Sequence, residues 1–380
     1  MHLLQDKIDP TKVYRRDEVP TSVDALTESW WTSCLRSSVV DAAVMGVERM
    51  GGDSGTHARH RFRLEWNEAG QWAQRPEAVF TKTLPTLMNR MIGGFNGTAK
   101  AEGRFYMEIR PHLEIESPIG YHAGFDAETF AAINVLEDVG VSRQATFCNA
   151  TTHVDRPMAE GMVELLADLH GSTMGDHRLT EEWRWVVNFA DWFAGGAKKM
   201  RTEKYTYQAL RRARHILPDS LVSSRKDIWR ATEASAQIHR DKQFLCLLHS
   251  DVHIGNWYQT GSGEMGLLDW QCLTQGHYAR DLAYALSAAL KPEDRQAWEH
   301  QLVQTYLLRL GNYDVTVPAF DEAWKAYRTQ LLHAFWMWTI TLCHSPLLPA
   351  MQTKATSLEM VRRIGIAIDD HRSIDVALGR

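Results

Sequence analysis

The chain has 380 residues, of which 44% are hydrophobic and 23% are charged, as in ordinary soluble globular proteins. This length exceeds the size of a single small core and favours two domains or lobes. The formal net charge of −5 comes without a long run of Lys or Arg, which argues against a nucleic-acid partner.

The cysteine pattern and the apolar stretches predict a cytoplasmic protein without a membrane partner. Five cysteines are scattered along the chain without a C-x-x-C pair, which argues against a disulfide scaffold or a zinc ribbon and for a reducing compartment. The N-terminal residues lack the apolar core of a signal peptide. The apolar stretch 331–351 is interrupted by His333, His344 and Pro346 and is shorter than a bilayer span requires, so we expect a buried helix there.

In chain order, the first part of the sequence predicts a β-rich region preceded by one helix. Residues 22–36 have the capping residues and the apolar face of an amphipathic helix. Strand patterns separated by Gly-rich or polar turns follow, together with one helical pattern. The strands are expected at 42–50, 57–66, 77–85, 118–126 and 129–139, and the helix at 98–113.

After about residue 140, helical patterns predominate. They cover residues 156–174, 281–292, 321–340 and 357–371, and the only strand-like interruption lies at 244–269. The sequence therefore predicts an α+β fold. Its small β-rich N-terminal lobe, with the leading helix, is expected at 1–138, and its larger, mostly helical C-terminal lobe at 139–380.

The strand-like interruption carries the most informative polar residues of the chain. A short apolar strand ends at His249 and opens the pattern H-x-D-x-x-x-x-N, which also contains Asp251 and Asn256. A Gly-Ser-Gly turn and a second strand pattern follow and end on Asp269, 18 positions after Asp251. We expect the two strands to form a hairpin that brings Asp251, Asn256 and Asp269 together at one end.

These three oxygen-bearing side chains suit phosphoryl transfer. Mg²⁺ prefers a few carboxylate or amide oxygens together with phosphates and water, so Asn256 and Asp269 fit as metal ligands. Asp251 fits as the group that orients a substrate hydroxyl and accepts its proton. Taken singly, each of these residues also fits a simple cap of a turn or strand end.

Three stretches of the chain resemble the aminoglycoside phosphotransferase and choline kinase-like family, whose members are distant relatives of protein kinases; they are HSDVHIGN, LLDWQ and GHYARDLAYAL. The resemblance covers residues 25–290 and implies a bilobal, protein-kinase-like fold. It also implies that Asp251 is the catalytic Asp and that Asn256 and Asp269 bind Mg²⁺.

The same resemblance implies that His249 and Asp281 are structural supports of the loop. The family has Gly between the His and the Asp of the motif, whereas this chain has Ser250. Ser tolerates a tight turn, so we expect a small change in the loop. His253 is interpreted as a solvated bystander, with a functional role left open.

The resemblance further implies an ATP-binding lobe in the N-terminal half. Lys82, in the strand pattern 77–85, has the position expected to contact the nucleotide phosphates. Glu102 is its expected partner, because E-x-x-F-Y matches the family's helix, and Glu108 is the alternative. The pair also fits a surface ion pair of little energetic weight.

A glycine-rich turn is expected between the first two strands, where backbone N–H groups would face the phosphates. Its residues are Gly51, Gly52, Ser54 and Gly55.

The sequence thus predicts an ATP- and Mg²⁺-dependent phosphotransferase that moves the γ-phosphate to a hydroxyl of a small molecule. From Lys291 to Arg380 there are 10 acidic and 10 basic residues and many aromatic ones. This balance favours a partly apolar alcohol over a polycationic aminoglycoside. The short segment from Trp270 to Asp281 leaves little platform for a peptide substrate.

Two alternative functions remain open from the sequence. One is a catalytically silent kinase-fold binding protein, which the complete set of polar residues disfavours. The other is a metal-dependent phosphoesterase, which D-V-H-I-G-N resembles superficially. Such a bimetallic site needs further His and Asp clusters, and the 17 histidines form no G-D or G-N-H-[DE] block. The oligomeric state is not predicted.

Overall fold

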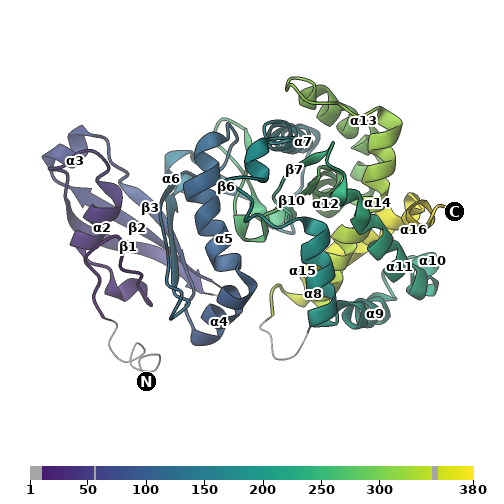
Figure 1. Cartoon of the computed structure of the whole chain (residues 1–380), viewed down its shortest axis with the longest axis horizontal. Helices are drawn as coiled ribbons and strands as arrows, with labels where there is room; N and C mark the ends of the chain where they lie inside the picture. Colours follow the sequence, from purple (N-terminus) through teal and green to yellow (C-terminus); the bar gives the residue numbers. More distant parts are fainter. Residues whose placement is uncertain (1–10, 55–56, 345–349) are drawn as a thin grey trace. The chain divides into compact units, whose positions relative to one another are not determined.

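The computed structural model describes residues 11–54, 57–344 and 350–380 and is shown in Figure 1. The chain forms two compact units, each assembled from separated pieces. The sheet unit comprises Met1–Leu113, Ser117–Thr146 and Asp269–Cys272, and the helical unit comprises Glu114–Glu116, Phe147–Leu268 and Leu273–Arg380. The predicted lobe division after residue 138 stays a prediction.

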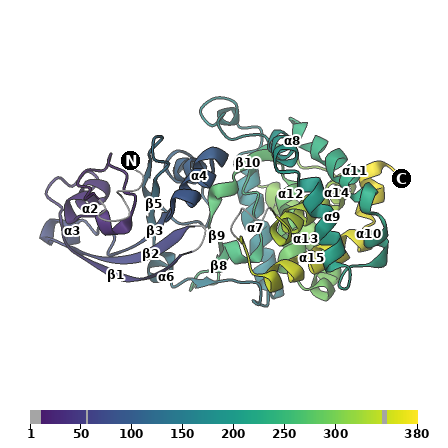
Figure 2. The same cartoon turned by 90° about the horizontal axis from the view of Figure 1, so that it is seen from below.

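The sheet unit is built on a five-stranded antiparallel sheet with the order β1-β2-β3-β5-β4 (Figures 1 and 2). Side chains alternate between its two faces, and one face packs on helix α2 (Glu28–Leu35) through Trp30 and Trp31. The strands are β1 (Val44–Ser54), β2 (Ala58–Trp66), β3 (Ala78–Thr83), β4 (Gly120–Phe125) and β5 (Ala132–Glu137).

Helix α5 (Thr98–Arg104) packs against β4 and β5, and its Glu102 also reaches Lys82 of β3. Gly103 permits the close approach, since a Cβ there would lie 3.0 Å from Ala123 and from Asn134. The predicted helix over 98–113 is only partly correct, because a π-helical turn at Phe105–Ile109 and a 3₁₀ turn at Arg110–His112 follow α5. The wider turn buries Phe105 and Ile109 together.

The shorter helices of the sheet unit lie between these elements. They are α3 (Glu68–Trp72), α4 (Leu87–Asn96) and α6 (Val139–Ser142), with a 3₁₀ turn at Val23–Ala25.

The helical unit packs its helices around α14 (Phe320–Leu342), which contacts α9, α11, α12, α15 and α16. The buried helix predicted over 331–351 is confirmed only up to Leu342, where α14 ends; Met351 is exposed, and residues 345–349 lie outside the described part of the chain. Among the described helices, none has the length and apolarity needed to cross a membrane. The other helices are α7 (Arg156–Gly171), α8 (Phe189–Met200), α9 (Thr202–Ala213), α10 (Asp219–Ser223), α11 (Arg225–Ser235), α12 (Ala279–Ala289), α13 (Pro292–Leu310), α15 (Lys354–Asp370) and α16 (Ser373–Leu378).

The strand pairing in the helical unit differs from the predicted hairpin. Strand β7 (Leu245–Leu248) pairs antiparallel with β10 (Thr274–His277), and β8 (Trp257–Gln259) pairs with β9 (Met265–Leu267). The prediction that residues 244–249 and 264–270 pair with each other is therefore wrong. Strand β10 reads T-Q-G-H and lacks the apolar alternation that marks a strand, so its pairing with β7 was missed. The two-residue strand β6 is Thr146–Phe147.

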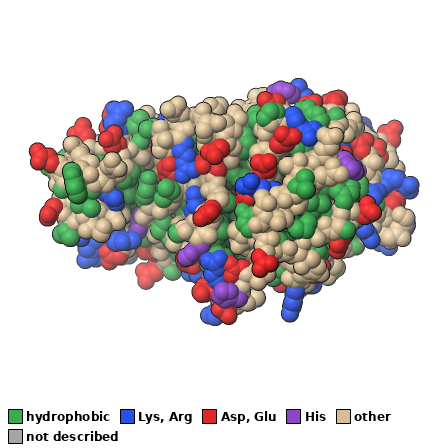
Figure 3. Space-filling model, turned by 90° about the horizontal axis from the view of Figure 1, so that it is seen from above, with side chains coloured by type: hydrophobic (Ala, Val, Ile, Leu, Met, Phe, Trp, Pro, Cys, Tyr) green, Lys and Arg blue, Asp and Glu red, His purple; other side chains and the backbone are tan. Residues whose placement is uncertain are grey.

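Charged side chains of both signs are interspersed over the face shown in Figure 3. None of the five cysteines, all of which lie in described residues, forms a disulfide.

Candidate active site

Lys82 lies at the centre of a buried ion cluster in the sheet unit. Its Nζ donates to Glu102 Oε1 at 3.0 Å and to Asp269 Oδ1 at 2.7 Å. Lys82 is 4% exposed, and the side chains of Glu102 and Asp269 are 2% and 12% exposed. The alternative partner, Glu108, instead binds Arg104.

Strand alternation explains how this cluster forms. Val79 lies in the core that contains α2, and Lys82, three residues later, faces the opposite side of the sheet. Asn134 is the register partner of Lys82 on β5, and its amide donates to Glu102 Oε2 at 3.2 Å. The sheet therefore presents the cation and one neutral donor to the carboxylate of α5.

Arg59 of β2 and His57, which directly precedes that strand, also lie near the cluster. Arg59 is the register partner of Lys82 on β2, and its Nη2 lies 3.9 Å from Asp269 Oδ2. His57 is buried, and burial together with the charge of Lys82 lowers its pKa to about 3. Neither residue is part of a motif that marks it in the sequence, although the alternation of β2 places Arg59 beside Lys82 once the strands are paired.

The cluster fixes the charge states of its members. Burial opposes the ionisation of Asp269, but the Lys82 ammonium more than offsets this and holds the pKa of Asp269 well below its ordinary value. Burial raises the pKa of Glu102. The pKa of Lys82 is raised by the two carboxylates against the effect of burial. Asp269 is thus an ionised carboxylate of the kind that binds a divalent cation.

Trp270 anchors Asp269 within the sheet unit. Its ring stacks on Phe105 at 3.9 Å between centroids, and its Nε1 donates to Ser117 Oγ at 3.0 Å. Asp269 itself has a φ of 68°, a left-handed conformation that Asp tolerates better than most residues. Asp269, with its left-handed backbone, is thus followed directly by Trp270, whose ring is fixed by stacking and by a hydrogen bond.

The predicted glycine-rich turn is largely strand. Gly51 and Gly52 pair with Arg61 and His60 in β1 and β2, so their prediction as turn residues is wrong. A Cβ on Gly52 would lie 2.3 Å from the Arg59 carbonyl oxygen, and this close approach accounts for the glycine. The strand ends at Ser54, and Gly55 lies outside the described residues.

In the helical unit, the loop after β7 is held by Asp281 of α12. The Asp281 carboxylate accepts hydrogen bonds from the backbone N–H groups of His249 and Ser250, at 2.7 and 3.1 Å. Ser250 has a φ of 69°, and its hydroxyl binds Thr274 Oγ1 at 2.5 Å. Ser is thus accommodated where a positive φ favours Gly.

The His249 ring connects this loop to the strand that precedes Asp269. Nδ1 of His249 accepts from the Asp251 backbone N–H at 3.2 Å, which leaves Nε2 to donate to the Leu268 carbonyl at 3.0 Å. The Leu268 N–H in turn donates to the Asn256 carbonyl at 3.0 Å. Through these contacts, the His249 side chain bridges the backbone at Asp251 and the backbone at Leu268.

Asp251 and Asn256 meet within this loop. The Asn256 amide nitrogen donates to the Asp251 carbonyl oxygen at 2.7 Å and lies 3.4 Å from Asp251 Oδ2. Because the side-chain amide nitrogen of Asn256 is used in this way, the side-chain oxygen Oδ1 is the atom left to bind a cation. Asp251 is 16% exposed, and its Oδ1 accepts from the Tyr284 hydroxyl at 3.1 Å. Tyr284 was not predicted as a site residue from the sequence.

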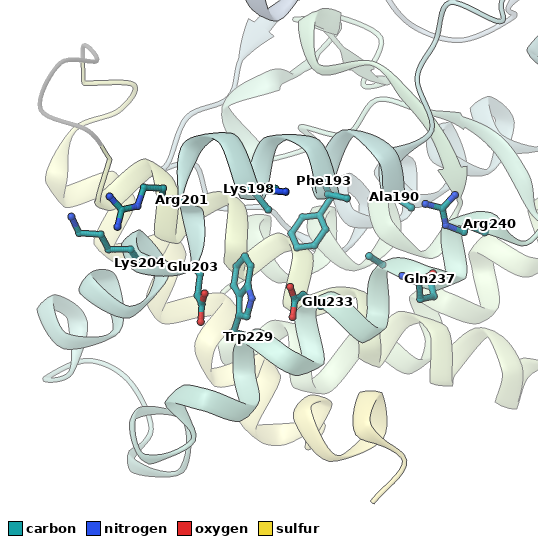
Figure 4. A pocket seen from close by; sticks show the side chains of 13 residues that line it. Ala190, Phe193, Lys198, Arg201, Glu203, Lys204, Trp229, Glu233, Gln237 and Arg240 are labelled. Carbon is teal, nitrogen blue, oxygen red and sulfur yellow. The ribbon is translucent and has the colours of Figure 1, made fainter.

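A groove of about 630 Å³ lies elsewhere in the helical unit, between α8, α9 and α11 (Figure 4). Phe193 and Trp229 form its apolar floor, with ring centroids 5.9 Å apart. Its described lining includes no predicted site residue. Among the described residues, the one His, Cys, Asp and Glu group close enough to share a metal ion is the exposed set His177, Glu181 and Glu182.

Comparisons with known proteins bear on the family. The profile of the phosphotransferase enzyme family (APH) matches residues 96–321, which is more than half of the chain. No curated protein sequence matches the chain.

Solved structures with similar folds include an ethanolamine kinase, a choline kinase and a macrolide 2'-phosphotransferase. An ethanolamine kinase of Plasmodium vivax has 11% identity and a TM-score of 0.48, over 86% of this chain and 83% of that chain. The choline kinase LicA of Streptococcus pneumoniae has 14% identity and a TM-score of 0.46, over 86% and 94%. The macrolide 2'-phosphotransferase MphH of Brachybacterium faecium has 12% identity and a TM-score of 0.45, over 85% and 94%.

The architecture and the profile agree. A unit built on a small antiparallel sheet and a mostly helical unit confirm the predicted α+β, protein-kinase-like fold class. The matched profile confirms the resemblance stated from the sequence motifs. The chain belongs to the phosphotransferase enzyme family.

Proposed function

We propose that this protein is an ATP- and Mg²⁺-dependent kinase of a small hydroxylated molecule, and that polycationic aminoglycosides are not its substrates. The observation that carries the proposal is the buried Lys82, which binds both Glu102 and Asp269. A buried cation between two carboxylates suits a site that binds the phosphates of a nucleotide and a divalent cation. The family assignment supports phosphoryl transfer as the reaction class.

The proposed chemistry is an in-line transfer. The acceptor hydroxyl oxygen forms a bond to the γ-phosphorus of ATP, the bond from that phosphorus to the bridging oxygen breaks, and ADP leaves. Asp251 orients the hydroxyl and takes its proton. Lys82, held by Glu102, binds phosphate oxygens, and Gly51, Gly52, Ser54 and Gly55 belong to the proposed phosphate-binding segment. Most of the rate then comes from positioning and electrostatics.

Asn256 and Asp269 are the proposed ligands of Mg²⁺. The ionised Asp269 carboxylate and the side-chain oxygen of Asn256 are hard oxygen donors, which Mg²⁺ prefers as ligands. When bound, Mg²⁺ would neutralise charge on the phosphate oxygens. His249 and Asp281 act as structural supports of the loop that carries Asp251.

Thermal unfolding with and without MgATP tests the nucleotide site. Ligand at a hundred times its dissociation constant should stabilise the fold by about 2.7 kcal/mol. We expect this stabilisation in the wild type and its loss in Asp269→Asn. Asp227→Asn is the control, since Asp227 pairs with Arg380 in the helical unit and belongs to no proposed nucleotide-binding segment. No stabilisation of the wild type by any nucleotide would contradict the proposal and favour a silent fold.

A screen of ADP release tests the acceptor. Neutral alcohols, sugars, quaternary ammonium alcohols and aminoglycosides are compared at equal concentration. Activity on aminoglycosides alone would contradict the proposed substrate class. Hydrolysis of a generic phosphate ester with Mn²⁺ or Zn²⁺ and without ATP would favour the phosphoesterase alternative.

A further inference from the structure

Helix α12 contacts the Asp251 loop twice. Asp281 accepts from the backbone of the loop, and Tyr284, three residues later on the same helix face, donates its hydroxyl to Asp251 Oδ1 at 3.1 Å. Every residue of α12 is buried. The helix is therefore a rigid support from which both contacts are made.

His253 lies on the other side of the Asp251 carboxylate. Its Nδ1 accepts from the Gly255 N–H at 3.1 Å, as the N-cap of the 3₁₀ turn Ile254–Asn256. The neutral ring therefore carries its proton on Nε2. That atom lies 3.8 Å from Asp251 Oδ2, so a small shift would make it a donor to the carboxylate.

Trp338 of α14 fixes the orientation of the His253 ring. The two rings pack edge to face with centroids 5.3 Å apart and an interplanar angle of 74°. Trp338 is 2% exposed, so the His253 ring packs against a buried aromatic side chain. The hydrogen bond from Gly255 and the packing on Trp338 together orient Nε2 towards Asp251. His253 is therefore not the solvated bystander that was expected from the sequence.

We propose that Tyr284 and His253 are positioning residues that orient the carboxylate of Asp251 from its two oxygens. The inference rests on the proposed function, in which Asp251 takes the proton of the acceptor. The Tyr284 hydroxyl donates to Oδ1, and Oδ2 is faced by the Asn256 amide nitrogen at 3.4 Å and by His253 Nε2 at 3.8 Å. Groups on both oxygens thus restrain the plane of the carboxylate, and loss of Tyr284 or His253 lets it rotate away from the geometry that suits the acceptor hydroxyl.

The test measures ADP release from MgATP with water as the acceptor. Tyr284→Phe keeps the ring and removes only the hydroxyl, so we expect kcat to fall about tenfold with KM for MgATP unchanged. Tyr278→Phe is the matched control, since the Tyr278 hydroxyl is buried without a partner in the described chain. We expect it to leave kcat unchanged.

His253 is tested with two amide substitutions. His253→Asn keeps the cap and loses the Nε2 donor, so we expect kcat to fall about fivefold. His253→Gln places an amide nitrogen near the position of Nε2 and should retain more activity than His253→Asn. Equal activity of the two variants would contradict the role of Nε2, and so would a ring ¹⁵N spectrum with the His253 proton on Nδ1.

The double variant separates positioning from a general structural effect. In an Asp251→Ala background, Tyr284→Phe should lower the residual rate no further, because its partner is absent. An additive loss, or an unchanged kcat in Tyr284→Phe alone, would overturn the inference while the proposed function stands. Equal rates in the wild type and Asp251→Ala would overturn the proposed function and this inference with it. Unfolding curves check that each variant is folded.

Discussion

The Lys82 cluster and the Asp251 loop hold their carboxylates in different ways. Asp269 is bound directly by a buried cation, Lys82. Asp251 accepts instead from the neutral Tyr284 hydroxyl, with the Asn256 amide nearby. An ion pair sets the charge of a carboxylate and suits the binding of phosphate and metal, whereas neutral donors leave the carboxylate free to take a proton.

The two regions also differ in what keeps the backbone in place. The Lys82 cluster lies on paired strands, so its geometry follows from sheet register. The Asp251 loop has no such ladder and depends on one buried carboxylate, Asp281, that accepts from two backbone N–H groups. We therefore expect the loop to be the more easily broken of the two regions by a single substitution.

The largest effect is expected from Asp251→Asn. An amide cannot accept the proton of the acceptor, so we expect kcat to fall about 10³-fold, equivalent to about 4 kcal/mol. The fold should remain intact, because the Tyr284 contact can be kept by an amide oxygen. Asp155→Asn is the control, since Asp155 caps α7 and Asn is an equally good cap. Retention of more than a tenth of the activity would argue against the role of Asp251.

The next largest effect is expected from Asp281→Ala. It leaves the N–H groups of His249 and Ser250 and the charge of Arg280 without their buried acceptor, at a cost of about 3 kcal/mol in the free energy of unfolding. Urea unfolding at neutral pH measures it. Asp227→Ala removes an exposed ion pair and should change the free energy by less than about 1 kcal/mol. Similar decreases in the free energy of unfolding in both variants would contradict the role of Asp281 as the buried acceptor that holds the loop.

Lys82→Met tests the ion cluster. It leaves the Glu102 and Asp269 carboxylates without their shared cation, and we expect kcat/KM for ATP to fall about 100-fold, equivalent to about 2.7 kcal/mol. Steady-state kinetics with varied MgATP measures this effect. Lys100→Met, an exposed change on the same helix as Glu102, is the control. An unchanged kcat/KM in Lys82→Met would separate the cluster from nucleotide binding.

The stability that Asp281 gives to the Asp251 loop should depend on pH. Burial opposes ionisation of Asp281, but the neighbouring His170 and the charge of Arg280 hold its pKa below the ordinary value. A lowered carboxyl pKa contributes stability that is present above the unfolded pKa of about 3.9 and is lost as pH falls below it. The stability gap between the wild type and Asp281→Asn should therefore narrow as the pH falls below about 4. Urea unfolding at a series of pH values measures it, and a constant gap would contradict the assignment.

The smallest effect is expected from Ser250→Gly. Glycine relieves the positive φ but loses the hydrogen bond to Thr274, so the two contributions oppose each other and the net change should stay within about 1 kcal/mol. Ser250→Val should destabilise by about 2 kcal/mol, because a β-branched residue disfavours this conformation. Thermal unfolding compares the two variants. Equal stability of Gly and Val would show that the backbone conformation is not what constrains this position.

Much of the architecture followed from local patterns in the sequence. Alternation predicted the strands that became β1 to β5, and helical periodicity predicted α7, α12, α14 and α15. The spacing of H-x-D-x-x-x-x-N and D-W pointed to the family, which the profile match confirmed. These signals are local, because a strand or helix repeats within a few residues and a motif keeps its order along the chain.

Other features depended on contacts between distant segments. The strand partner of β7 is the polar β10 rather than β9, because pairing is decided by long-range register that local hydrophobicity does not encode. At Gly52, strand β2 approaches too closely for a side chain, whereas a Cβ on Gly51 would meet no described atom within 4 Å. The sequence by itself determined the fold class and the motif residues. The family resemblance already favoured Glu102 over Glu108 as the partner of Lys82, and the contact is present. The tertiary structure alone decided that Tyr284 reaches Asp251, because this contact requires a buried site shared by two separated elements.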